Sequence, residues 1–243
     1  MERLILIETS TALCSAALAE DGVIISYRES SAPKAHASLT AVFIQEMLAE
    51  KGLSIADCNA ICVSMGPGSY TGLRVGVSTA KGLCFGSGKP MIAVGTLDTL
   101  VAQASTHGQD ATISENAEEP AYIVPMIDAR RMEVYSAVFE KTADTSSCAY
   151  NQITETTPVI VDETSFADIL EKGKVLFIGD GAGKCADVIK HPNATFVQCW
   201  PNAAAMLNPA MTGYKEKRFE DVAYFEPFYL KEFVATVSKK KMW

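Results

Sequence analysis

Residues 60–72 read Ala60-Ile61-Cys62-Val63-Ser64-Met65-Gly66-Pro67-Gly68-Ser69-Tyr70-Thr71-Gly72. The first six are mostly apolar, as in a buried strand, and a helix rich in small residues is predicted over residues 71–85. Glycine permits positive φ angles and close approach by other backbone atoms, and this loop leads from a strand into a helix N-terminus. The stretch therefore predicts either an anion or nucleotide site, or a tight turn packed beneath a neighbouring segment.

Further strand and helix patterns surround this stretch in the first half of the chain. Short β-branched or apolar runs indicate strands, and Asp21-Gly22 is a frequent hairpin turn pair. Gly52 is a candidate C-cap for the first helix. The expected strands are residues 4–7, 16–18, 23–27 and 91–94, and the expected helices are residues 36–50 and 97–104.

The second half partly repeats this order after a polar stretch, residues 106–120, which is the best linker candidate. Its expected strands are residues 122–127, 133–140, 159–161, 175–178 and 196–197, with helices between them and Asn202 as an N-cap. Strands that alternate with helices predict an α/β fold with mixed sheets, and the echo suggests a duplicated domain. We place one domain at residues 1–108 and a smaller one at 109–243, whose last helix can return to the first.

Composition narrows the classes of function. The chain has 243 residues, 48% of them hydrophobic, which is typical of a folded globular protein. A net charge of −8 disfavours a broad nucleic-acid surface, and the one basic cluster, Lys239–Lys241, is interpreted as a solvated tail. Seven cysteines without a Cys-x-x-Cys pair indicate buried thiols in a reducing compartment. With no apolar run as long as a membrane span, a cytoplasmic location without membrane contact is expected.

Signatures of catalysis or of a cofactor are incomplete. The Gly-Lys pairs at residues 88–89 and 183–184 lack the first glycine and the hydroxyl of a phosphate-binding P-loop. His36, His107 and His191 are far apart and show no metal-ligand spacing. We therefore expect no metal, no intrinsic cofactor and no catalytic residue.

The helix at residues 36–50 carries more apolar residues than one packed face requires. At about 100° per residue they divide into two arcs, one of which can pack on a sheet. The first arc is Leu39, Val42, Phe43 and Met47, and the second is Ala41, Ile44 and Leu48. Whichever arc does not pack on the sheet is expected to face another helix, a second domain or another chain. The next helix contains the small residues Gly76, Ser78, Ala80 and Gly82, which favour close contact between helices.

Three motifs together closely resemble the TsaB (YeaZ) family of bacterial proteins. They are Ile7-Glu8-Thr9-Ser10, residues 66–74 ending in Leu73-Arg74, and Met126-Ile127-Asp128-Ala129-Arg130-Arg131. The resemblance is dense over residues 3–140 and looser afterwards. Its motif positions are Glu8, Thr9, Ser10, Gly66, Pro67, Gly68, Ser69, Tyr70, Thr71, Gly72, Asp128 and Arg130.

This resemblance implies an ASKHA fold, actin-like and hexokinase-like, with two RNase H-like domains and a cleft between them. It also implies a catalytic partner, TsaD, which transfers a threonylcarbamoyl group to the adenosine beside the tRNA anticodon, and an ATPase, TsaE. The first two helices are expected to bundle with those of TsaD, or with a second copy of this chain, and tRNA is contacted only indirectly. The implied interface is His36, Leu39, Val42, Phe43, Met47, Arg74, Gly76, Ser78 and Ala80; a nucleotide there is left open.

The same resemblance separates this chain from TsaD. Ala12 and Leu13 stand where TsaD has acids beside the substrate phosphate, and Thr96 and Leu100 stand where it has metal-binding histidines. The resemblance thus implies a non-catalytic scaffold. The rivals are a phosphotransferase or carbamoyltransferase using Glu8, Asp128 and Arg130, a peptidase, and a self-sufficient homodimeric binding module. Asp128, Arg130 and Arg131 form either a functional cluster or a turn held by its own ion pairs.

Overall fold

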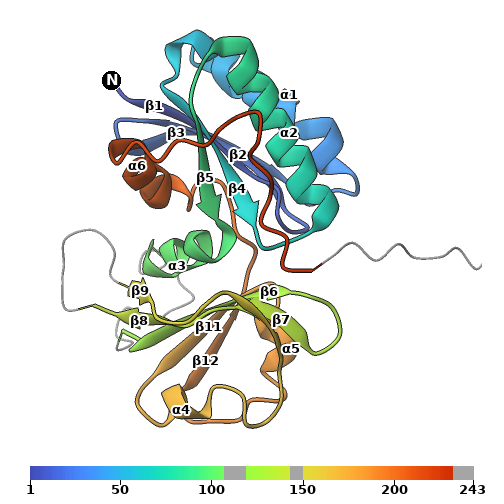
Figure 1. Ribbon diagram of the computed structural model, residues 1–243, viewed down its shortest axis with the longest axis vertical. Helices are drawn as coiled ribbons and strands as arrows, with labels where there is room; N and C mark the ends of the chain where they lie inside the picture. The colour runs from blue at the N-terminus through green and yellow to red at the C-terminus, as the bar shows by residue number, and fades with distance from the viewer. Residues whose placement is uncertain (107–118, 143–149, 232–243) are drawn as a thin grey trace, which may run out of the picture.

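Two mixed β-sheets, one from each half of the chain, make up the computed structural model (Figure 1), which describes residues 1–106, 119–142 and 150–231. Most of the predicted linker, together with His107 and the basic tail Lys239–Lys241, lies outside these residues. Because the proposed boundary at residue 108 lies there too, the division into domains stays a prediction.

The first sheet has the strand order β3-β2-β1-β4-β5. Its strands are β1 (Arg3–Glu8), β2 (Cys14–Glu20), β3 (Val23–Ser30), β4 (Ala60–Gly66) and β5 (Met91–Gly95). The pairs β1–β2 and β2–β3 are antiparallel, whereas β1–β4 and β4–β5 are parallel. Asp21 and Gly22 both have positive φ, 47° and 80°, so the predicted hairpin turn is confirmed.

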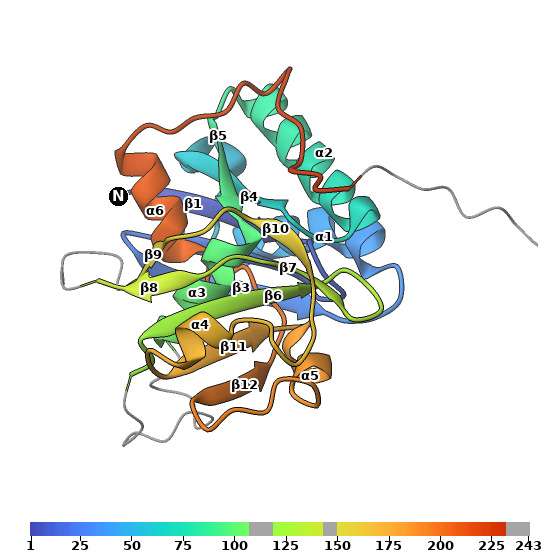
Figure 2. The same cartoon turned by 60° about the horizontal axis from the view of Figure 1, so that its bottom comes forward.

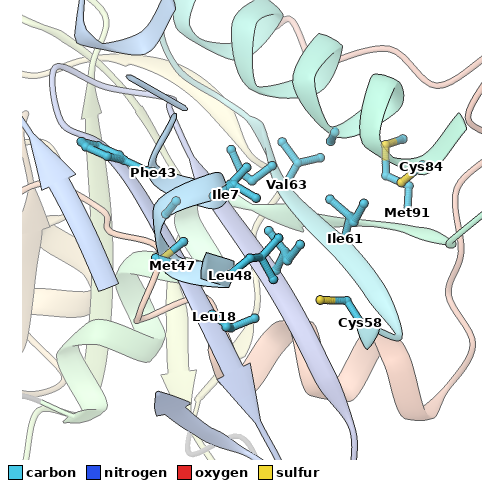
Figure 3. Packing of buried hydrophobic residues seen from close by; sticks show 14 of the residues in the cluster. Ile7, Leu18, Phe43, Met47, Leu48, Cys58, Ile61, Val63, Cys84 and Met91 are labelled. Atoms are coloured by element: carbon cyan, nitrogen blue, oxygen red, sulfur yellow. The ribbon is translucent and has the colours of Figure 1, made fainter. Parts of the chain in front are cut away.

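Two long helices, α1 (Ala35–Glu50) and α2 (Tyr70–Ser87), cover one face of this sheet, and a short 3₁₀ turn, η1 (Ile55–Asp57), lies between them. Figure 3 shows Phe43, Met47 and Leu48 of α1 directed at apolar strand residues such as Ile7 and Ile61. These side chains are fully or almost fully buried, which makes this contact the main core of the first half.

The second sheet repeats the order of the first as β10-β7-β6-β11-β12. Its strands are β6 (Tyr122–Asp128), β7 (Glu133–Ser136), β10 (Thr157–Ile160), β11 (Val175–Gly179) and β12 (Ala194–Gln198). Strand directions correspond as well: β6–β7 and β7–β10 are antiparallel, and β6–β11 and β11–β12 are parallel. The repeat predicted from the sequence is therefore visible in the sheets.

The predicted strand at residues 133–140 is interrupted in the structure. Its second part is β8 (Phe139–Lys141), which pairs with β6 and with β9 (Tyr150–Gln152). Pro125 of β6 has no N–H to donate opposite the interruption, so the ladder cannot continue there. Asn202 accepts a hydrogen bond from Ala205 N at 3.0 Å and caps a turn, whereas the following helix begins only at Leu207.

Two helices are exchanged between the halves (Figures 1 and 2). Helix α3 (Thr96–Thr106), from the first half, packs under the second sheet through Leu97, Leu100 and Val101. Helix α6 (Leu207–Lys215), from the second half, packs with the preceding turn on the free face of the first sheet through Met206 and Ala210. Among its described residues, the second half otherwise has the short helices α4 (Ala167–Leu170) and α5 (Ala182–Cys185). Across the described residues, no helix combines the length and apolar character needed to cross a membrane.

Candidate functional site

The glycine-rich loop packs tightly against the turn between β1 and β2. A Cβ atom at Gly68 would lie 2.4 Å from the carbonyl oxygen of Ser10, and one at Gly72 would lie 2.1 Å from that of Thr9. At Gly76 it would lie 2.2 Å from Thr9 Oγ1, which donates to the carbonyl of Gly72 at 2.9 Å. Close packing, the second of the two readings of this stretch, therefore accounts for these three glycines.

Residues 228–231, at the end of the described chain, contact the same glycine-rich loop. The amide of Phe228 donates to the carbonyl of Met65 at 2.7 Å, and its own carbonyl approaches Gly66, whose φ is 110°. The rings of Tyr229 and Tyr70 lie 4.7 Å apart, between centroids. Residues 228–231 thus cross the start of α2 and close one side of a cleft.

Glu8 is fully buried behind the β1–β2 turn and does not line the cleft. Its Oε1 accepts the backbone N–H of Ser10 at 2.7 Å, while Oε2 has no hydrogen-bond partner among the described residues. Burial raises the pKa of this carboxyl group, and hydrogen bonds from Ser10 and Ser64 oppose that rise. Glu8 is placed to hold the turn from behind.

The turn after β6 is held by a carboxylate and a lysine. Asp128 Oδ1 accepts the backbone N–H of Arg130 at 2.9 Å and forms an ion pair with Lys184. Burial raises the pKa of Asp180 to about 6, and its Oδ1 accepts the N–H of Asp128 at 2.8 Å. Arg130 and Arg131, with φ of 72° and 51°, form no ion pair with any described carboxylate. The turn is thus stabilised through Asp128 and Lys184, and not by ion pairs of its arginines.

A cleft of about 900 Å³ separates these two turns. One wall holds the β1–β2 turn with residues 67–71 and His36, whose Nε2 lies 2.8 Å from the carbonyl of Thr11. The opposite wall holds residues 127–131 with Glu133, Tyr135 and Asp180, and residues 228–231 close one side. The cleft therefore joins all three family motifs around one space. Within the described residues, no group of three or more His, Cys, Asp or Glu side chains is placed to hold a metal ion.

The predicted division of α1 into two arcs is wrong. Phe43, Ile44, Met47 and Leu48 are all buried against the first sheet and form one wide face. Residues four positions apart lie nearly above one another on a helix, and consecutive residues are about 100° apart around its axis. Residues 43, 44, 47 and 48 therefore cover a single face that is roughly 140° wide. Ala41, assigned to the second arc, is exposed.

Four of the predicted interface residues belong to the chain's own core. Phe43, Met47, Gly76 and Ala80 are buried, so their side chains are not available to a partner. The others remain at least partly accessible: Val42, Arg74 and Ser78 are exposed, and His36 and Leu39 are half-buried.

The accessible side of α2 includes a residue that sequence reasoning missed. Phe85 is 88% exposed and lies in register with Arg74, Ser78 and Gly82, at spacings of three or four residues. It borders a shallow apolar groove formed with residues 221–223. The three- and four-residue spacing of Phe85 from these positions was the signal in the sequence that could have identified it. We call the exposed positions Val42, Arg74, Ser78, Gly82 and Phe85 the helical face.

Comparison with known proteins identifies the family. Residues 29–237 match the family model described as TsaD: tRNA N6-adenosine threonylcarbamoyltransferase. The tRNA threonylcarbamoyladenosine biosynthesis protein TsaB of Escherichia coli is 32% identical over 238 residues, which cover 96% of each chain. The TsaB protein of Bacillus subtilis is 30% identical, with 93% of this chain and 92% of the relative covered.

A solved structure shares the fold over nearly the whole chain. YeaZ from Pseudomonas aeruginosa superposes with a TM-score of 0.78 at 22% identity, covering 95% of this chain and all of the other. The fold implied by the resemblance, an actin-like arrangement of RNase H-like units, is thereby confirmed. Given matches of this length and identity, the chain belongs to the TsaB (YeaZ) family.

Proposed function

We propose that this chain is a non-catalytic accessory subunit in the biosynthesis of threonylcarbamoyladenosine in tRNA. The observation that carries the proposal is the full-length similarity, at 30–32% identity, to proteins named for this biosynthesis. Its partner is a catalytic TsaD-like subunit, joined by a TsaE-like ATPase, and tRNA is reached through the partner. The proposed complex works in the cytoplasm.

The absence of catalysis in this chain is supported by the residues at the positions that matter in TsaD. Thr96 and Leu100 are completely buried, so neither can reach a metal ion bound in the cleft. Ala12 lines the cleft without a carboxylate. Asp128 is already engaged by Lys184, and Glu8 lies behind the wall.

The helical face is the proposed contact with TsaD. Ser78 and Gly82 are small enough for another helix to approach closely, and Phe85 offers a large apolar anchor at one end. In helix-in-groove contacts, one helix is anchored by side chains spaced three or four residues apart, which is the spacing of the helical face. In the absence of TsaD the same face pairs two copies of this chain. The division into residues 1–108 and 109–243 belongs to this proposal, with the helical face on the first unit.

Reconstitution tests the proposal directly. The chain is mixed with TsaD and TsaE of its own organism, and transfer of threonylcarbamoyl from its preformed adenylate to tRNA is measured. TsaD is expected to require this chain, and the chain alone to give no product. Ser78→Trp, which blocks close approach, should abolish the stimulation, whereas Asn208→Trp on the exposed side of α6 should not. Full activity of TsaD without the chain, or turnover by the chain alone, contradicts the proposal.

A further inference from the structure

The last described segment, residues 216–231, lies on the first half of the molecule although it follows α6 of the second half (Figures 1 and 2). The backbone N–H of Glu220 donates to the carbonyl of Met91 in β5 at 2.9 Å, and the two residues form an antiparallel bridge. Val222 and Phe225 pack against the core beneath α1 and α2. We call residues 216–231 the strap, and these backbone and core contacts fix it to the first half.

The strap reaches the second half at its far end. There the ammonium group of Lys231 forms an ion pair with Glu133 of β7 and lies 5.9 Å from the centroid of the Tyr135 ring. The two paired side chains are 42% and 21% exposed. An ion pair that water can reach contributes little to stability and is screened by salt, so this attachment is easily broken. The strap is thus held firmly by one half and weakly by the other.

Two stacked contacts determine where Lys231 lies. The ring of Tyr229 lies 4.7 Å from that of Tyr70, between centroids, and the guanidinium carbon of Arg74 lies 4.4 Å from the centroid of the Tyr70 ring. Both kinds of contact are attractive. Because Tyr229 is two residues before Lys231, fixing its ring limits the positions that the ammonium group can reach. Arg74 belongs to the helical face, so this series of contacts extends from that face to the second half.

We propose that the strap is a clasp across the cleft, in which the stacked side chains hold Lys231 against Glu133 and Tyr135 of the other half. With Lys231 engaged, the cleft is closed on this side. When the ion pair breaks, the strap stays on the first half, and the second half is free to move away, which opens the cleft. The helical face and the cleft are therefore linked through the strap. Every group in the clasp belongs to this chain, so the clasp does not rest on the proposed function.

The test measures the width of the cleft in the complete, purified chain without partners. Spin labels are attached to unnatural residues at Ala37, next to His36 of one wall, and at Ile160, which pairs with Glu133 of the other. Both positions are exposed, so the labels need no buried space. Pulsed EPR measures the distance between the labels. We expect a short distance from closed molecules and a longer one from open molecules, and one fixed distance in every variant overturns the proposal.

Removing the charge of the clasp should shift the balance between the two distances. Lys231→Met should raise the ratio of open to closed molecules about threefold or more, and about 1 M NaCl should raise it in the unaltered chain but not in this variant. Lys190→Met is the matched control, because it removes a lysine from an ion pair with Asp187 inside the second half, and it should leave the ratio within about 1.5-fold. Equal ratios in the two variants overturn the proposal.

An exchange of charges separates the ion pair from a merely structural role of its two residues. Lys231→Glu should favour the open form, since it places a like charge beside Glu133. Combined with Glu133→Lys, it restores opposite charges and should return the ratio to within about twofold of that in the unaltered chain. A ratio that stays as high in the double variant as in Lys231→Glu overturns the clasp.

The link to the helical face has a variant of its own. Arg74→Gln removes the cation above Tyr70 without changing Lys231 or Glu133, and it should raise the ratio of open to closed molecules about twofold. Ser78→Ala, one turn further along the same face, is the control and should leave the ratio unchanged. If Arg74→Gln behaves like Ser78→Ala, the stack does not hold the clasp, and the link between the helical face and the cleft is overturned.

Discussion

The two halves of the molecule have the same sheet order but very different helices. Between corresponding strands, the first half has α1 and α2, with 16 and 18 residues, and the second half has α4 and α5, with four residues each. The second sheet shows that short connections are enough to form this strand order. The longer helices of the first half bury the main core of that half on one side, and in the proposed function they present the helical face to a partner on the other.

Glycines at the joints between strands and helices differ in what a Cβ atom would meet. Both central parallel strands end at a glycine with positive φ, Gly66 at 110° and Gly179 at 131°. A Cβ atom would lie 2.1 Å from the Thr9 carbonyl oxygen at Gly72 and 2.3 Å from the Met126 carbonyl oxygen at Gly179, whereas at Gly181 the nearest atom is the side-chain Cγ1 of Val134, at 2.9 Å. A backbone cannot move aside as a side chain can, so position 72 tolerates a Cβ atom less well than position 181.

The largest effect is expected at these joints. Gly72→Ala places a Cβ atom 2.1 Å from a carbonyl oxygen and should lower the free energy of unfolding by about 3 kcal/mol or more. Gly181→Ala, 2.9 Å from Val134 Cγ1, should cost about 1 kcal/mol. Gly82→Ala, with open space around it in α2, should add about 0.5–1 kcal/mol. Urea denaturation measures all three, and equal losses at positions 72 and 181 would remove this contrast between backbone and side-chain neighbours.

Asp180, a half-buried acid of the second half, should make stability depend on pH. The pKa of Asp180 is about 6 in the folded chain and near 3.8 without burial, so the folded state binds the proton of this carboxyl group more tightly than the unfolded state does. The resulting contribution to stability is complete below pH 3.8 and is lost as pH rises through 6. Asp180→Asn keeps an acceptor for Asp128 N and should be more stable than the unaltered chain at pH 7 by up to about 3 kcal/mol. The difference should vanish near pH 4, as measured by urea unfolding across this range. A constant difference would show that titration is not its cause.

Exposed apolar residues of the two halves should behave differently toward a partner. Phe85 of α2 and Ile160 of β10 are 88% and 75% exposed. Phe85→Ser should weaken binding to a TsaD-like partner at least 30-fold, about 2 kcal/mol, because an exposed aromatic anchor is lost. Ile160→Ser is the matched control and should leave affinity and stability unchanged. Titration calorimetry provides the measurement, and equal effects would exclude the helical face as the contact.

The smallest effect is expected at Asp128. Its ion pair with Lys184 is partly exposed, and Asn can still accept the N–H of Arg130, so Asp128→Asn should cost less than about 1 kcal/mol. Lys184→Met should cost more, because the ammonium group also donates to the carbonyls of Arg131 and Glu133, both at 2.7 Å. Thermal unfolding compares the two variants, and equal losses would mean that the ion pair, not the carbonyl contacts, holds the turn.

Local patterns were enough to predict most of the elements from the sequence. Apolar runs located the central strands, and Asp21-Gly22 located the hairpin, because both signals act within a few residues. The interruption between β7 and β8 was missed, since it depends on Pro125 in a different strand.

The site was harder to predict than the fold. The sequence pointed to Asp128 and Arg130 but not to Lys184, which lies more than 50 residues away and reaches Asp128 only after folding. It also could not tell which apolar residues of α1 and α2 stay exposed, because Phe43 and Phe85 look alike until the sheet is in place. Periodicity identifies a helix face, whereas its partner is decided by tertiary contacts.

The exchange of α3 and α6 has a consequence for how the protein is made. Residues that cover one face of the first sheet, among them Met206 and Ala210, leave the ribosome long after the strands that they cover. Leu4, Leu6 and Ile92 on that face therefore stay without their cover during most of translation. Exposed apolar surface on a growing chain attracts chaperones or other nascent chains. We therefore expect the first half, produced on its own, to leave this apolar face exposed and to be less stable than the whole chain.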